Sequence, residues 1–254
     1  MLISVVTVCF NSSKTISHTL ESFLSQTYPS KELLVIDGGS TDGTVELVQR
    51  LQVPEIRMIS EPDQGIYDAM NKGLRQFQGD AVGFLNSDDK FNNPRSLEHI
   101  AASLAEFDCA HGHLRYVSSH ESLETVRLWR ASPRPRSGFK SGWVPSHPTF
   151  YCRAHIAKKV GLFDTSLKIS ADYDWMLRAI ELHNASIGQV DEVLVDMMVG
   201  GASTESLRAR VQGNIEKLRS RQTNLGAPFL DYATIAMPLS KIKQVLRLEQ
   251  PLRN

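Results

Sequence analysis

The first part of the chain alternates short apolar runs with helical hydrophobic spacing. Residues 2–10 are a nearly unbroken apolar run with several β-branched side chains, which predicts a strand buried on both faces. Three further apolar runs predict strands, at residues 32–37, 57–60 and 81–85. Apolar residues at helical spacing follow three of these strands and begin at Ile16, Thr44 and Ile66. This alternation is typical of parallel strands joined by helices.

The second part of the chain is less regular and predicts a mixed sheet. Strand-like runs occupy residues 111–118, 125–131 and 187–199. Helical spacing occupies residues 153–160, 172–183 and 204–222, and an amphipathic basic segment follows at 231–248. We therefore expect an α/β fold with an open, twisted, mostly parallel sheet flanked by helices, and a C-terminal helical extension over residues 201–254.

Composition narrows the class of protein. The 254 residues carry 28 Lys and Arg against 28 Asp and Glu, so no overall charge favours nucleic acid as a partner. Three scattered cysteines are too few for a disulfide framework. No apolar run approaches the ~18–20 residues that span a bilayer. We expect a cytoplasmic globular enzyme or binding protein.

Three polar clusters fall directly after predicted parallel strands, at 11–12, 37–40 and 86–89. The carboxyl ends of parallel strands share one edge of a sheet, and ligands of such folds collect there. We therefore expect these clusters to form one rim. The chain has neither the GxGxxG dinucleotide fingerprint nor the GxxxxGK[ST] phosphate loop, which disfavours dehydrogenases and P-loop ATPases.

Two of these clusters carry carboxylates suited to ligand binding. Asp88 and Asp89 could hold a hard divalent cation, Mg²⁺ or Mn²⁺, or simply satisfy a turn. Asp37, followed by Gly38 and Gly39, could accept hydrogen bonds from a nucleobase or ribose, or cap the next helix.

Other candidates lie in the second half. Asp172 opens a predicted helix, where a carboxylate is either a cap or a general base. His147, between two prolines, could contact a diphosphate or an acceptor hydroxyl, or have no role. The aromatic residues Trp143, Tyr173 and Trp175 could stack on a sugar or pack in the core.

Five segments in order resemble the inverting family 2 glycosyltransferases with the GT-A fold, in the branch that builds bacterial capsule, exopolysaccharide and colanic-acid-type sugars. They are SVVTVCFN at 4–11, VIDGGSTDGT at 35–44, SEPDQGIYDAMNKG at 60–73, FLNSDD at 84–89 and ADYDWMLR at 171–178. The resemblance covers about residues 2–200. It implies a nucleotide-sugar half at about 1–90 and an acceptor half at about 91–200, followed by the extension.

The resemblance also implies residue roles. Asp172 is the implied catalytic base, and Asp88 and Asp89 are the implied metal ligands. The implied nucleotide-binding residues are Thr7, Phe10, Asn11, Asp37, Gly65, Asn71, Asn86 and Ser87. Weaker contacts to acceptor or diphosphate are implied for His147, Trp143, Tyr173 and Trp175. Three residues depart from the family pattern: Asn86 replaces the first Asp of the DXD motif, Ala171 the Glu of the ED motif, and Met70 an Arg.

The implied activity is metal-dependent, inverting transfer of a sugar from a nucleotide sugar, with UDP the expected carrier. The implied acceptor is a saccharide or lipid-linked saccharide in bacterial surface polysaccharide synthesis. Residues 228–254 could contact the inner face of the cell membrane, or pack on the domain or a second subunit; the oligomeric state stays open. The alternatives are a non-catalytic nucleotide-sugar-binding or assembly subunit and a nucleotidyltransferase.

Overall fold

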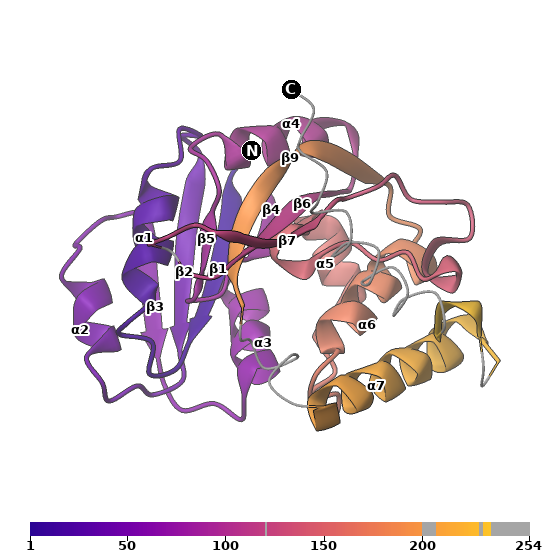
Figure 1. Ribbon diagram of the computed structural model, residues 1–254. Helices are drawn as coiled ribbons and strands as arrows, with labels where there is room; N and C mark the ends of the chain where they lie inside the picture. The colour runs from indigo at the N-terminus through magenta and orange to yellow at the C-terminus, as the bar shows by residue number, and fades with distance from the viewer. Residues whose placement is uncertain (120, 200–206, 229–230, 235–254) are drawn as a thin grey trace.

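A computed structural model describes residues 1–119, 121–199, 207–228 and 231–234 (Figure 1). The strands are β1 (Ile3–Cys9), β2 (Lys31–Asp37), β3 (Ile56–Ser60), β4 (Ala81–Phe84), β5 (Asp89–Phe91), β6 (Cys109–Val117), β7 (Thr125–Trp129), β8 (Tyr151–Arg153) and β9 (Ile187–Met198). The helices are α1 (Ile16–Leu24), α2 (Thr44–Gln49), α3 (Ile66–Gln76), α4 (Ser96–Glu106), α5 (Ala154–Val160), α6 (Ala171–Leu177) and α7 (Leu207–Leu225). Short 3-10 turns cover Gly138–Ser141 and His147–Thr149, and a π-helical turn, Arg178–Leu182, continues α6.

One sheet runs through the described part of the chain in the order β3-β2-β1-β4-β8-β6-β9-β5, with β7 paired to β6. Pairing is parallel from β3 through β2 and β1 to β4. Beyond β4 the sheet is mixed, because β8, β5 and β7 pair antiparallel while β6 and β9 pair parallel. The expected α/β sheet, regular at first and mixed afterwards, is confirmed.

Helices cover both faces of this sheet, and each face has its own core. Alternate side chains of β1 show the division: Val6 and Val8 pack with α3, α5 and α6, whereas Val5 and Cys9 pack with α1, α2 and α4. Strands buried on both faces produce the unbroken apolar runs seen in the sequence. Their burial fixes the register of the strands, and therefore the positions of the loops that follow them.

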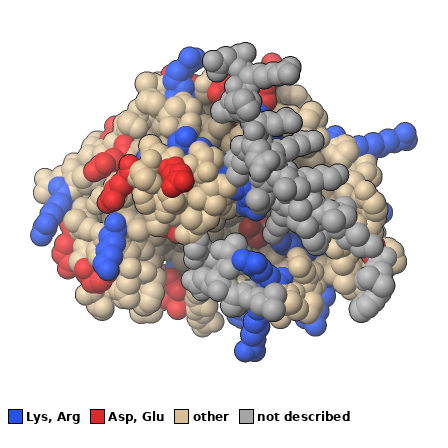
Figure 2. All heavy atoms as spheres, viewed as in Figure 1, with Lys and Arg blue, Asp and Glu red and all other residues tan. Residues whose placement is uncertain are grey.

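Three elements are absent from the sequence prediction: β5, α4 and β8. The predicted amphipathic segment at 231–248, for which a membrane contact was suggested, lies outside the described residues from 235 onwards. Within the described residues, no helix combines the length and hydrophobicity that crossing a bilayer requires. Acidic and basic side chains are interspersed on the left side of the view in Figure 2, where Figure 1 places α1 and α2.

His111 is a core histidine whose protonation opposes folding. His111 of β6 is 2% exposed, and neither ring nitrogen has a hydrogen-bond partner among the described residues. Burial, and secondarily the nearby His113, lowers the pKa of His111 to about 4. The folded state therefore binds a proton less readily than the unfolded state, whose histidine has a pKa of about 6.5. Stability falls as pH decreases from 6.5 towards 4.

We expect His111→Leu to remove most of this pH dependence. Between pH 7.5 and pH 5 the wild-type protein should lose about 2 kcal/mol more of its free energy of unfolding than the variant loses. Urea unfolding followed by circular dichroism at both pH values measures the difference. The exposed His183→Leu variant should retain the wild-type dependence. Equal losses in wild type and His111→Leu would contradict the assignment.

Candidate active site

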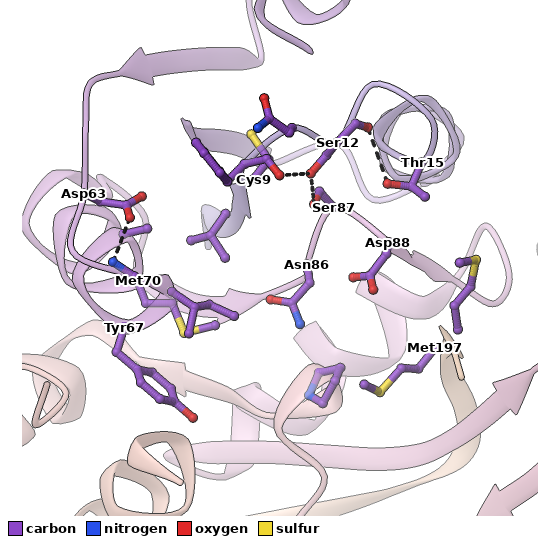
Figure 3. A pocket seen from close by; sticks show the side chains of 18 of the residues that line it. Cys9, Ser12, Thr15, Asp63, Tyr67, Met70, Asn86, Ser87, Asp88 and Met197 are labelled. Atoms are coloured by element: carbon purple, nitrogen blue, oxygen red, sulfur yellow. Dashed lines mark hydrogen bonds between the residues drawn. The ribbon is translucent and has the colours of Figure 1, made fainter. Parts of the chain in front are cut away.

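A cavity of about 890 Å³ opens at the carboxyl ends of β1 and β4, with Asn86, Asp88, Tyr67 and Met197 around it (Figure 3). Its walls come from both halves of the chain. The first half contributes the loops after β1 and β4 and the start of α3. The second half contributes 147–148, 168–169, Asp172 and 197–198. This volume lies within the range of small-molecule sites.

Side-chain hydrogen bonds tie the three polar loops together. The N–H of Asn11 donates to Ser40 Oγ at 2.7 Å, and Asn11 Oδ1 accepts from the N–H of Thr41 at 3.0 Å. Ser87 Oγ donates to Ser12 Oγ at 2.9 Å, which joins the loop after β4 to the loop after β1. The expectation of one shared rim is confirmed, and these bonds hold the rim in a single arrangement.

Asp37 lies beneath this rim and not on the cavity wall. Its side chain is fully buried and accepts from the N–H groups of Gly39 (3.1 Å) and Ser40 (3.0 Å) and from Ser60 Oγ (2.7 Å). Burial alone would raise the pKa of Asp37, but the hydrogen bonds from Ser40 and Ser60 outweigh it and lower the pKa. Asp37 shapes the loop here, and direct contact with a base would require that loop to open.

The two aspartates after β4 differ in environment. Asp88, with Asn86 and Ser87, lines the cavity (Figure 3). Asp89 is fully buried in β5, where Asn86 Nδ2 donates to its Oδ2 at 3.3 Å. Burial, and then the charge of Asp88, raises the pKa of Asp89 well above its usual value. Asp88 is therefore the carboxylate that this loop presents to a ligand.

Asp172 reaches the same cavity from the second half of the chain. It is the second residue of α6, and Tyr67 of α3 donates its hydroxyl to Asp172 Oδ1 at 3.3 Å. The Tyr67 ring is held in turn by Phe163, with 5.9 Å between ring centroids. Asp88 and Asp172, far apart in sequence, thus line one cavity.

Among the described residues that line the cavity, acidic side chains outnumber basic ones. Its carboxylates belong to Asp42, Asp63, Asp88 and Asp172. Its ammonium groups belong to Lys14 and Lys168. An anionic ligand such as a diphosphate would meet an unfavourable potential here unless a cation accompanied it.

The mouth of the cavity has an apolar part. Phe10 is 63% exposed and Ile66 is 44% exposed, and both line the cavity next to Asn11 and Gly65. Gly65 has a φ of 113°, a conformation that side chains rarely adopt, and it begins α3. An exposed aromatic ring beside amide groups can stack on a planar heterocycle while the amides hydrogen-bond its edge.

His147 also lines the cavity, and its ring stacks on Phe84 with 5.4 Å between centroids. Burial lowers the pKa of His147, although the charge of Asp172 opposes that effect. The imidazole is therefore neutral at pH 7. Its Nε2 is buried and has no hydrogen-bond partner in the described part of the chain.

Besides Asp37, two further expected nucleotide contacts lie away from the cavity wall. Thr7 is fully buried within β1. Asn71 is 3% exposed and exchanges two hydrogen bonds with the backbone of Phe163, at 3.0 and 2.8 Å. Asn71 thereby joins α3 to the loop that precedes α6.

Of the three aromatic candidates, Tyr173 and Trp175 pack in the interior, and Trp143 is partly buried against the same core. Trp143 donates its indole N–H to the carbonyl of Ser132 at 3.0 Å, and Trp175 donates to the carbonyl of Gly161 at 2.7 Å. Trp175 and Tyr173 are each 2% exposed. Of the two roles open for these residues, the structure favours core packing.

The sequence model of Glycosyl transferase family 2 matches residues 4–161. The chain belongs to this family. An uncharacterised glycosyltransferase of Mycobacterium tuberculosis is 33% identical over 183 residues, covering 70% of this chain and 68% of that protein. The putative teichuronic acid biosynthesis glycosyltransferase TuaG of Bacillus subtilis is 36% identical over 112 residues, covering 43% of this chain and 44% of TuaG.

Solved structures confirm the GT-A-like fold of this glycosyltransferase. S. aureus TarS 1–349 in complex with UDP-GlcNAc aligns with a TM-score of 0.69 at 21% identity, covering 98% of this chain and 73% of that one. The Pyrobaculum calidifontis mannosyltransferase PcManGT, in complex with GDP-Man and Mn²⁺, aligns with a TM-score of 0.65 at 15% identity, covering 99% of this chain and 76% of that one.

The structure adds lining residues that sequence reasoning did not single out. They include Lys14, Asp42, Asp63, Tyr67 and Lys168. Tyr67 and Asp63 fall within the motif at 60–73, so the motif signalled the segment without revealing which side chains face the cavity. No spacing signal marks Lys168, because only the fold brings it to the glycosyltransferase cavity.

Tyr67→Phe should lower the kcat of sugar transfer about tenfold, since a hydrogen bond to a carboxylate contributes roughly 1.5 kcal/mol. The donor KM should change less than about twofold. Steady-state release of nucleoside diphosphate measures both constants. Tyr28→Phe is the matched control, because the Tyr28 hydroxyl donates to the carbonyl of Met1. An unchanged kcat in Tyr67→Phe would show that Asp172 does not depend on this bond.

Proposed function

We propose that this glycosyltransferase transfers a sugar, with inversion, from a nucleotide sugar to a hydroxyl of a saccharide or lipid-linked saccharide in bacterial surface polysaccharide synthesis. UDP is the expected carrier. The teichuronic acid role in the name of TuaG and the UDP and UDP-GlcNAc complexes of TarS support this proposal.

The observation that carries the proposal is the presence of Asp88 and Asp172 on one cavity. Asp88 follows a strand of the parallel half, and Asp172 comes from a helix of the other half. A transferase needs separate groups for the leaving nucleotide and for the attacking hydroxyl. A cavity with a carboxylate from each half meets this need, whereas a nucleotide sensor would need no base at Asp172.

In the proposed reaction the acceptor hydroxyl attacks the anomeric carbon from the face opposite the nucleotide. Asp172 accepts the hydroxyl proton as the new carbon–oxygen bond forms and the bond to the diphosphate breaks. The Tyr67 hydroxyl donates to Oδ1 of Asp172. Oδ2 of Asp172 therefore receives the proton of the acceptor hydroxyl. Attack from the opposite face inverts the configuration at that carbon.

The residues present fit a divalent cation bound together with the donor. Asp88 offers a carboxylate, and Asn86 Oδ1 in the same loop is buried without a hydrogen-bond partner in the described residues. No group of three or more His, Cys, Asp or Glu side chains among the described residues is arranged to hold a metal by itself. Mg²⁺ sites commonly combine one or two carboxylates with substrate phosphates. Such a cation would neutralise charge on the departing diphosphate.

The apolar mouth and the lysines complete the proposed donor site. Phe10 would stack on the base while Asn11 and Gly65 border it, and Lys14 and Lys168 would offset diphosphate charge. His147, neutral and close to Asp172, would contact the acceptor side. These roles agree with a diphosphate-linked donor entering an otherwise acidic cavity.

Asp172→Asn should reduce transfer at least a hundredfold and leave donor binding intact, because the amide keeps the shape but cannot accept the proton. Donor affinity by calorimetry and nucleoside diphosphate release with a lipid-diphosphate-sugar acceptor are the two measurements. UDP-, GDP- and dTDP-sugars should each be screened with the wild-type protein first. Transfer that persists in Asp172→Asn would refute the base assignment, and binding without any turnover in wild type would favour a sensor.

Asp88→Asn and Asp89→Asn should separate the two candidate metal ligands. Asp88→Asn should raise the Mn²⁺ or Mg²⁺ concentration for half-maximal activity at least tenfold, since a cavity-facing charge is lost. Asp89→Asn should have little effect, because Asp89 is fully buried in β5 and does not line the cavity. Activity that survives strong chelation would remove the metal from the proposal.

A further inference from the structure

A buried glutamate of α7 holds the backbone that leads into the helix of Asp172. Glu216 is 1% exposed. Its Oε1 accepts from the N–H of Lys168 at 3.0 Å, and its Oε2 accepts from the N–H groups of Ile169 and Ser170 at 2.9 Å each. These are the three consecutive residues before α6, and Lys168 and Ile169 also line the cavity.

The start of helix α6 has no side-chain cap of its own. It has seven residues, and Ser170 at its N-cap makes no capping hydrogen bond. Ser170 Oγ instead donates to the carbonyl of Gly213 in α7 at 3.1 Å. The N–H groups at an uncapped helix start need partners from neighbouring elements, and such contacts fix where the helix begins.

Helix α7 also makes hydrogen bonds to the residues that follow Asp172. Arg221 donates to the Tyr173 hydroxyl at 3.0 Å, and Ser220 Oγ donates to Asp174 Oδ1 at 2.7 Å. Figure 1 shows α7 running alongside α6. Helix α7 thus holds the chain on both sides of Asp172.

Hydrogen bonds compensate the burial of the Glu216 carboxylate. Burial alone would raise the pKa of Glu216, but hydrogen bonds from Gln212 and from the backbone at 168–170 outweigh it and lower the pKa. Hydrogen bonds from N–H groups to a charged acceptor are stronger than those to a neutral one. A neutral amide at this position would accept fewer of the three bonds.

We propose that Glu216 is a positioning residue of the reaction: its three backbone hydrogen bonds set the place from which Asp172 reaches the acceptor hydroxyl. This inference rests on the proposed function. It also makes α7 part of the active-site framework, although α7 lies beyond residues 4–161, which the family model matches.

The test is Glu216→Gln in the full chain. We expect kcat to fall at least tenfold, because Asp172 directly follows the residues that Glu216 holds. The donor KM should change by a smaller factor than kcat, because Lys168 is the one proposed donor contact among those residues, and Phe10, Lys14 and Asp88 lie on other loops. Hydrogen–deuterium exchange should be faster at the amides of 168–170. The exchange measurement does not require turnover. It therefore reports on the hydrogen bonds between Glu216 and residues 168–170 even if the donor or acceptor used is a poor substrate.

Glu32→Gln is the matched control. Glu32 is also a buried carboxylate that accepts a backbone N–H, from Gln78 at 2.8 Å, but it lies at the amino end of β2, away from the cavity. It should lower stability without changing kcat or exchange at 168–170. If Glu216→Gln does not fold, Glu216→Asp, which keeps the charge on a shorter stem, should show the same fall in kcat.

The outcomes separate the two proposals. The positioning role alone is overturned if the wild-type protein turns over and the folded Glu216 variant keeps either the wild-type kcat or the wild-type exchange at 168–170. Equal effects in Glu32→Gln also overturn it, since they would indicate general loss of stability. Absence of acceptor-dependent transfer in wild type, across the donor screen, overturns the proposed function and this role with it.

Discussion

The pairing of β4 with β8 is the constraint on which the site depends. This antiparallel contact joins the parallel half of the sheet to the mixed half. Gly83 permits it, because a Cβ there would lie 2.4 Å from the Tyr151 ring. Antiparallel neighbours bring the end of one strand to the start of the other, so 86–88, which follow β4, meet 147–148, which precede β8. One side of the cavity is therefore a direct consequence of strand order.

The fold of the first half could be predicted closely because its strands are buried on both faces. Predicted strands at 2–10, 32–37 and 57–60 agree with β1, β2 and β3 to within one or two residues at each end. The missed strands β5 and β8 have three residues each, too few to show any period, and they form only because longer neighbours supply partners. Helix α4 did carry a pattern, with Leu97, Ile100 and Leu104 buried, and sequence reading overlooked it.

Motifs located the site better than they identified its side chains. The segments that contain Asp88 and Asp172 do line the cavity. Side-chain direction could not be predicted, since it depends on tertiary partners: Asn71 turns to the Phe163 backbone, and Asp37 turns to its own loop. Tyr67, which does face Asp172, was indistinguishable in sequence from any core aromatic residue.

Burial separates the carboxylates that shape the fold from those available for chemistry. Asp37 and Glu216 are buried but receive several hydrogen bonds, so their pKa values are lowered and their charges fix nearby backbone. Asp89 is equally buried with fewer donors, and its pKa is raised. Asp88 and Asp172 line the cavity, where a ligand can reach them. Two buried carboxylates, Asp37 and Glu216, thus fix the backbone next to the cavity that Asp88 and Asp172 line.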